Sequence, residues 1–291
     1  MKLIDGKKIA EEIRMEIATE VAALIDADKR APHLVAVLVG DDAASQTYVA
    51  SKEKASASVG MTSSVYKHPA TISEKELLDI VDFLNADDEV DGFIVQLPLP
   101  SHIDENKVIE RIDPKKDVDG FHPVNVGKMT LGLPSHVSAT PKGIMTLLER
   151  NKIGTSGKNV VVVGRSNIVG TPISILLSRK ADNANATVTL CHSRTENLKE
   201  VCRRADILIA AIGVCEFVKA DMVKEGAVVI DVGIHRVKSD KTKSGFKLKG
   251  DVAFDEVAKK CSYITPVPGG VGPMTIVSLI QNTLSAYKKE Y

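Results

Sequence analysis

Four polar side chains in the first half of this 291-residue chain have types and spacing that suit ligand binding and proton transfer. Tyr48 and Lys52 lie four residues apart in a segment with a helical pattern, which places both side chains on one face. Gln96 ends an apolar run that predicts a buried strand, and α/β proteins place site residues at such strand ends. Asp119 lies in a loop among glycine and proline. A lysine transfers protons once desolvation or a polar neighbour lowers its pKa.

Each of these side chains also has an interpretation that involves no chemistry. The Tyr48 and Lys52 pair could decorate a solvent-exposed helix face, and Gln96 could cap a neighbouring segment. Asp119 precedes a glycine, and aspartate before glycine commonly forms a turn.

A run near the C-terminus, Ile264–Thr275 (ITPVPGGVGPMT), contains three prolines and three glycines. Proline lacks a backbone donor and glycine adds backbone entropy, so this density disfavours a regular strand or helix. We therefore predict a stiff loop whose backbone lies close against a flat ligand. The alternative is an ordinary connector.

The segment Val160–Pro172 (VVVVGRSNIVGTP) reads as a strand, a glycine turn and the start of a helix. This context suits a dinucleotide-binding turn, in which amides at the helix N-terminus face the pyrophosphate. Gly164 and Gly170, with Ser166 between them, do not match the spacing GxGxxG. A purely structural turn therefore stays open.

The next predicted strand, Thr187–Cys191, ends in His192, Ser193, Arg194 and Thr195. NAD-specific sites usually have an acidic residue here for the ribose 2′-hydroxyl, and no carboxylate appears before Glu196. With Arg165 after the first turn glycine, these cationic and hydroxyl groups favour a 2′-phosphate and hence NADP. The alternative is a solvated basic surface with a helix cap. The loop containing Ile212 and Gly213 could pass the nicotinamide side.

Composition excludes several function classes. The formal net charge is zero, so charge makes no case for nucleic acid or an anionic membrane as a partner. No stretch approaches eighteen apolar residues, and the four cysteines form no CxxC pair or zinc-like spacing. We predict no metal site, reduced thiols and a cytoplasmic location. Gly154–Lys158 has the wrong spacing for a phosphate-binding GxxxxGK[ST] loop and is followed by Asn159, and the glutamate of a calcium loop is missing from its required position.

Strand and helix patterns alternate along the whole chain, which predicts an α/β fold with two domains. We place the boundary near residue 140, where a long stretch rich in proline, glycine, aspartate and histidine ends. The predicted domains are residues 1–140 and 141–272, and the helix at 273–291 is expected to return to the first domain. The second domain has the strand and helix series of a Rossmann-like fold.

Four segments together resemble the bifunctional methylenetetrahydrofolate dehydrogenase/cyclohydrolase family, often called FolD. They are the C-terminal run already described and three earlier ones, at residues 45–52 (SQTYVASK), 96–102 (QLPLPSH) and 113–123 (DPKKDVDGFHP). The likeness covers essentially the whole chain, with the segments in the family's order. One departure is Ser138-Ala139 before Thr140-Pro141, where the family commonly has a cysteine.

The resemblance implies two reactions in one site, in a cleft between an αβα catalytic domain and an NADP-binding domain. NADP+ would oxidise 5,10-methylenetetrahydrofolate to the 5,10-methenyl form, and water would then open the ring to 10-formyltetrahydrofolate, as in one-carbon metabolism. Lys52 would activate water and handle protons, Gln96 would hold Lys52, and Asp119 and Tyr48 would hold the pterin. Further substrate contacts are implied for Leu97, Pro98, Gly270 and Pro273.

The same resemblance implies that NADP lies against the glycine turn and the loops after the next strands, and that the protein forms a homodimer. The implied cofactor residues are Gly164, Arg165, Ser166, Ile168, Gly170, His192, Ser193, Arg194, Thr195, Ile212, Gly213 and Ile234. Two alternatives remain at this point. One is a monofunctional NAD-linked dehydrogenase, and the other is a non-catalytic folate-binding protein.

Overall fold

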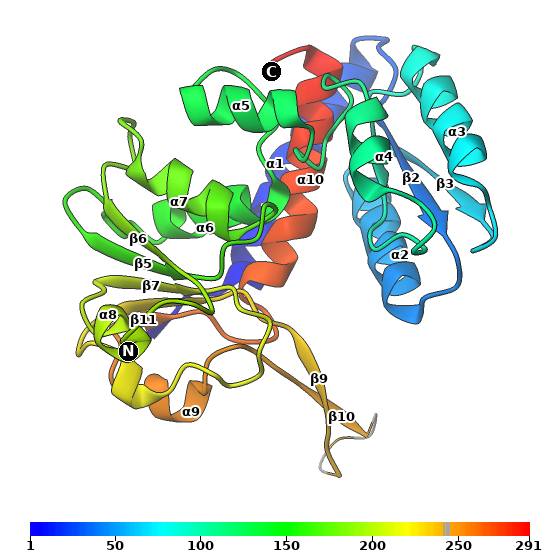
Figure 1. The fold of residues 1–291 in the computed structure, drawn as a ribbon. Coiled ribbons are helices and arrows are strands. Elements are labelled where there is room, and N and C mark those ends of the chain that lie inside the picture. Colours follow the sequence, from blue (N-terminus) through cyan, green and yellow to red (C-terminus); the bar gives the residue numbers. More distant parts are fainter. Residues whose placement is uncertain (241, 243–244) are drawn as a thin grey trace. The chain divides into compact units, whose positions relative to one another are not determined.

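The computed structural model describes residues 1–240, 242 and 245–291. The chain divides into two compact units, each with its own parallel sheet. The six-stranded unit comprises Met1–Ala10 and Thr140–Thr275, and the three-stranded unit comprises Glu11–Ala139 and Ile276–Tyr291. Figure 1 shows the ribbon of both. Two α/β units confirm the predicted fold class, whereas the predicted cleft stays a prediction.

The three-stranded unit has a parallel sheet in the order β3-β2-β4. Alternate residues of β2 pack on opposite faces, because successive strand side chains point to opposite sides. Val35, Val37 and Val39 pack with α3 and α4, while Leu34, Ala36 and Leu38 pack with α2 and α10. Its elements are most of α1 (Gly6–Asp26), β2 (His33–Val39), α2 (Ala43–Ser58), β3 (Thr62–His68), α3 (Glu74–Ala86), β4 (Gly92–Val95), α4 (Glu105–Arg111), α5 (Pro123–Leu131) and most of α10 (Val271–Lys288). The first residues of α1 and α10 belong to the six-stranded unit.

The start of α3 illustrates how the sequence sets these boundaries. Ser73 and Glu76 form a capping box, in which each side chain accepts a hydrogen bond from the other residue's backbone amide. Leu77, Val81 and Leu84 then follow at helical spacing and are fully buried.

The six-stranded unit has an all-parallel sheet in the order β1-β11-β8-β7-β5-β6. Its central strands are continuous apolar runs because helices cover both faces. Figure 1 shows α6 and α7 on one side of this sheet and α8 and α9 on the other. The elements are β1 (Lys2–Leu3), α6 (Ala139–Arg150), β5 (Asn159–Val163), α7 (Gly170–Ser178), β6 (Thr187–Cys191), α8 (Leu198–Cys202), β7 (Ile207–Ala210), η1 (Ala220–Met222), β8 (Val228–Asp231), β9 (His235–Lys238), β10 (Phe246–Lys249), α9 (Phe254–Val257) and β11 (Tyr263–Ile264).

The structure corrects two expectations about the ends of the chain. The predicted first domain began at residue 1, but Met1–Ala10 group with the six-stranded unit because β1 pairs with β11. The predicted loop Ile264–Thr275 is shorter than expected, since α10 already begins at Val271. Pro273 is tolerated in the first turn of α10, after Gly272, because the backbone amides of a first helical turn have no hydrogen-bond partner inside the helix and proline has no amide hydrogen to lose.

Three further observations bear on earlier expectations. Cys191, Cys202, Cys215 and Cys261 are free, and only Cys215 is exposed. Among the described residues, no helix is long and apolar enough to cross a membrane. The described part of the chain also contains no group of three or more histidine, cysteine, aspartate or glutamate side chains arranged to hold a metal ion.

Candidate active site

The three-stranded unit brings Lys52 and Gln96 together. The carboxylate of Asp42 accepts a hydrogen bond from the Ser45 amide and caps α2, which carries Tyr48 and Lys52. Gln96 directly follows β4, and its backbone amide donates a hydrogen bond to the Val37 carbonyl of the neighbouring strand. The Nζ of Lys52 donates to the Oε1 of Gln96 at 3.2 Å. The Nε2 of Gln96 donates to the Leu97 carbonyl at 2.7 Å, which fixes the oxygen toward the lysine.

Asp119 lies near Lys52 and comes from a loop that runs beside β4. The segment before it runs beside β4, where Phe93 forms a parallel bridge with Asp117. Asp119 lies two residues further along, near the end of β4 that carries Gln96. Burial raises the pKa of Asp119, and the positive charge of Lys52 partly opposes this shift.

Asp117, which the sequence analysis did not single out, holds this loop in shape. Its buried carboxylate accepts hydrogen bonds from the backbone amides of Gly120, Phe121 and His122 and from the Asn125 side chain. In the sequence, the only sign of this role is that an aspartate stands two positions before Asp119.

Tyr48 is 47% exposed, so its ring is free to lie against a ligand. Leu97 and Pro98 continue the chain directly after Gln96 and are joined by a cis peptide bond. The structure therefore places Lys52, Gln96 and Asp119 together, with Leu97 and Pro98 beside them.

In the six-stranded unit, the glycine turn between β5 and α7 brings three backbone segments very close together. Gly164 has φ of +115°, and a Cβ at this position would clash with the Ala211 carbonyl. A Cβ on Gly170 would clash with the Gly164 carbonyl. Both positions therefore require glycine. The hydroxyl of Ser166 accepts hydrogen bonds from the Val169 and Gly170 amides, so this side chain binds two backbone amides just at the start of α7.

The loop after β6 presents two polar side chains outward. The His192 amide donates to the Thr195 hydroxyl at 2.9 Å, and the Arg194 amide donates to the His192 ring at 3.1 Å. This turn leaves Ser193 and Arg194 exposed. Val163 pairs with Cys191 on the neighbouring strand. The exposed Arg165 comes two residues after Val163, so it lies at the same edge of the sheet as the loop after β6.

The remaining predicted residues of this unit lie in three places. Ile212 and Gly213 lie in the loop after β7, and Ile168 is exposed in the glycine turn. Ile234, Gly270 and Pro273 line a cavity of about 140 Å³ formed largely by the Pro266–Pro273 segment. The structure thus places the predicted residues on the glycine turn, on the loops after β6 and β7, and around this cavity.

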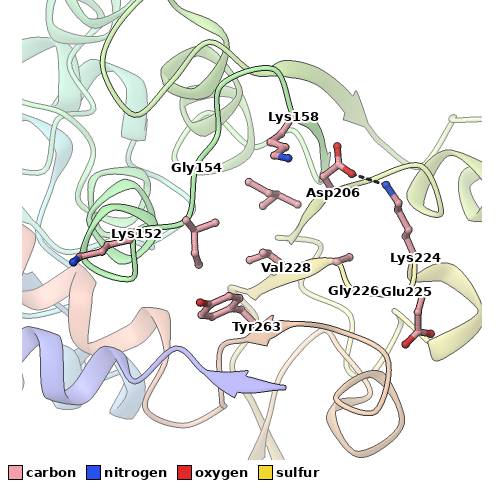
Figure 2. A pocket seen from close by; sticks show the side chains of 12 residues that line it. Lys152, Gly154, Lys158, Asp206, Lys224, Glu225, Gly226, Val228 and Tyr263 are labelled. Atoms are coloured by element: carbon pink, nitrogen blue, oxygen red, sulfur yellow. Dashed lines mark hydrogen bonds and ion pairs between the residues drawn. The ribbon is translucent and has the colours of Figure 1, made fainter.

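A separate cavity of about 340 Å³ lies at the amino-terminal ends of β5, β7, β8 and β11. Figure 2 shows its lining, in which Lys224 donates to the Asp206 carboxylate at 2.5 Å. None of the predicted site residues lines it. Open α/β sheets bind ligands at the carboxyl ends of their strands, so we do not assign the site to this cavity.

Comparison with known proteins shows the family to which this chain belongs. The family model for the catalytic domain of tetrahydrofolate dehydrogenase/cyclohydrolase matches residues 4–119, and the model for the NAD(P)-binding domain matches residues 138–291. The bifunctional protein FolD of Porphyromonas gingivalis is 62% identical over 290 residues, covering 100% of this chain and 98% of that protein.

Solved structures show the same likeness. The bifunctional enzyme FolD of Campylobacter jejuni has a TM-score of 0.93 at 46% identity, covering 100% of both chains. The Trypanosoma brucei dehydrogenase-cyclohydrolase, solved with NADP cofactor and inhibitor, has a TM-score of 0.93 at 39% identity, covering 99% of this chain and 97% of that one. The chain therefore belongs to the tetrahydrofolate dehydrogenase/cyclohydrolase family, the family of the bifunctional FolD proteins.

Proposed function

We propose that this chain oxidises 5,10-methylenetetrahydrofolate to 5,10-methenyltetrahydrofolate with NADP+ and then hydrolyses the product to 10-formyltetrahydrofolate. Family membership supports the two reactions, and relatives at 62% identity carry the bifunctional name. The single observation that carries the proposal is the contact of Lys52 with Gln96 beside Asp119.

In the hydrolysis, Lys52 assists proton transfer as water attacks the methenyl carbon and the ring opens. The side-chain oxygen of Gln96 holds the amine in place. The side-chain nitrogen of Gln96 is itself held by the Leu97 carbonyl. Asp119 binds the amino-pyrimidine edge of the pterin through its carboxylate, while the exposed Tyr48 ring orients the substrate. Leu97, Pro98, Gly270 and Pro273 supply further substrate contacts. Positioning of this kind lowers the entropic part of the barrier.

The residues of the six-stranded unit fit NADP. Gly164 and Gly170 leave room at the glycine turn that a Cβ would fill. Arg165, Ser193 and Arg194 are exposed, and no carboxylate ends β6, as a 2′-phosphate requires. Ser166, Ile168, His192, Thr195, Ile212, Gly213 and Ile234 complete the proposed contacts. When bound, NADP+ supplies the hydride acceptor.

An absorbance assay tests the proposal with purified protein and 5,10-methylenetetrahydrofolate, using either NADP+ or NAD+. Loss of the methenyl form is followed in the same run. Turnover with NADP+ and subsequent hydrolysis is the expected result. Turnover with NAD+ alone and no hydrolysis would instead indicate a monofunctional NAD-linked dehydrogenase. Binding of folate without any turnover would indicate a non-catalytic folate-binding protein.

We propose further that the protein is a homodimer. β3 is an edge strand that pairs only with β2 among the described residues. Beside it, Tyr66, Ile80 and Phe83 line an open apolar groove, and Phe83 is 60% exposed. Long uncovered edges next to apolar surface are usually protected in native proteins. Sedimentation of Phe83→Asp tests the proposal. A monomer is expected, and an unchanged dimer would exclude this surface.

We also propose a cytoplasmic location, because all four cysteines are free thiols and disulfides persist in oxidising compartments. Cell fractionation with an antibody against the protein tests this proposal.

A further inference from the structure

Two buried aspartates lie together at the carboxyl edge of the six-stranded sheet, and neither was singled out from the sequence. Asp231 ends β8 and Asp251 follows β10, and their residues are 3% and 0% exposed. Buried charges are retained only where hydrogen bonds satisfy them. The partners of these two carboxylates therefore indicate what they do.

Asp251 binds the loop that follows β7. Its Oδ2 accepts hydrogen bonds from the amides of Ile212 at 2.7 Å and Gly213 at 2.9 Å. Its Oδ1 lies 2.8 Å from the Nε2 of His235, at the start of β9. One carboxylate thus connects two segments that flank the proposed nicotinamide side of the site.

Asp231 in turn holds the segment that carries Asp251. Its Oδ1 accepts from the amides of Gly233 at 2.9 Å and Asp251 at 2.8 Å, and its Oδ2 accepts from the Val252 amide at 3.0 Å. A Cβ on Gly250 would clash with the Asp231 carboxylate, and a Cβ on Gly233 would clash with the Asp251 side chain. The two segments therefore interlock and leave Asp251 little freedom to move.

We propose that Asp251 is a positioning residue for the dehydrogenase reaction, because its carboxylate fixes the Ile212–Gly213 loop against which the nicotinamide end of NADP+ binds. This inference rests on the proposed function. It assigns Asp251 no contact with folate and no part in the hydrolysis, whose proton-transferring Lys52 and its partner Gln96 belong to the three-stranded unit.

Asp251→Asn is the primary variant, because the amide has nearly the same shape as the carboxylate. Its single oxygen can face the two loop amides or His235, but not both. Loss of hydrogen bonds to a buried charged acceptor is expected to raise the KM for NADP+ about 10-fold or more. Asp255→Asn is the matched control, because Asp255 is exposed four residues further along.

The experiment measures the KM for NADP+ and the kcat of the dehydrogenase reaction. Hydrolysis of supplied methenyltetrahydrofolate without nucleotide is measured in parallel, as a reaction that a merely structural loss would also slow. A second pair of variants keeps the test decisive if Asp251→Asn does not fold. His235→Ala removes the contact to the Asp251 Oδ1, whereas His235→Gln retains a donor and is expected to restore NADP+ affinity.

A raised KM for NADP+ with hydrolysis within about 2-fold of wild type, and an unchanged Asp255→Asn control, is the expected result. An unchanged KM in Asp251→Asn, or a proportional fall in both activities, would overturn the inference while leaving the proposed function intact. For the histidine pair, equal affinities in His235→Ala and wild type would overturn it. Absence of any turnover in the wild type would overturn the proposed function and this inference with it.

Discussion

The Nζ of Lys52 lies 3.2 Å from the Oε1 of Gln96, although the two residues are 44 positions apart in the chain. Lys52 lies on helix α2, and Gln96 directly follows strand β4. A neutral amide oxygen holds the amine without the strong preference for the ammonium form that a carboxylate would impose. This arrangement suits a lysine that both accepts and releases a proton.

Gln96→Glu tests the importance of that neutral partner. A carboxylate at this position would favour the charged ammonium, so the pH of half-maximal hydrolysis should rise by about 1 unit or more. Hydrolysis at neutral pH should fall correspondingly. The pH–rate profile measures both effects, with Gln46→Glu on the exposed face of α2 as the control. A profile that coincides with wild type would contradict the proposed role of Gln96.

Asp119→Asn should bind folate more weakly yet raise stability at neutral pH. Burial raises the pKa of Asp119 above its ordinary value, with Lys52 opposing. A raised folded-state pKa means that the stability contribution is present below the unfolded pKa and is lost as pH rises through the folded pKa. Above the unfolded pKa the wild-type carboxyl group therefore carries a cost in stability that asparagine removes.

The measurement is the melting temperature of both proteins at about pH 7 and about pH 4, the latter near the unfolded pKa of aspartate. The variant should melt higher at the first pH, and the difference should shrink at the second. The KM for the folate substrate should rise about 10-fold or more, because a charged hydrogen-bond acceptor is lost. A variant that is less stable at both pH values would show that the carboxylate is a net stabilising group.

Arg194→Ala tests the cofactor preference. The exposed guanidinium is proposed to pair with the 2′-phosphate, so its removal should raise the KM for NADP+ about 10-fold and leave any activity with NAD+ unchanged. Arg204→Ala, which removes another exposed arginine of the same unit, is the control. Equal losses with both nucleotides would place Arg194 away from the 2′-phosphate.

The sequence predicted the sheet strands of both units closely where patterns are local. The strand predicted at the start of Val160–Pro172 ends at Val163, because a continuous apolar run of this length is typical of a buried parallel strand. Thr187–Cys191 also has the predicted bounds, although it is an edge strand in which polar and apolar residues alternate. The hairpin β9–β10 and the helix α5 were not predicted. The polar strands of the hairpin lack a buried face, and α5 lies in a stretch that its proline and glycine content made irregular.

The candidate site was predictable as a set of motifs but not as a network. Lys52 and Gln96 emerged from helix spacing and a strand end, and the resemblance related them to each other. Asp117, Asp231 and Asp251 could not be identified in this way, because their importance lies in the amides they bind. Those amides become their partners only when segments far apart in the sequence meet, as when Asp251 binds Ile212 and Gly213. The exchange of Met1–Ala10 to the other unit depends likewise on strand pairing that the sequence does not reveal.

The most direct test of the central claim is the rate at which Lys52→Met hydrolyses supplied methenyltetrahydrofolate. Methionine retains the length and apolar stem of lysine but cannot transfer a proton. Lys54→Met, on the exposed part of α2, is the matched control. We predict a fall of about 100-fold or more for Lys52→Met, with binding of NADP+ unchanged in the folded variant. Hydrolysis within about 3-fold of wild type would contradict the assignment of Lys52 as the proton-transferring group.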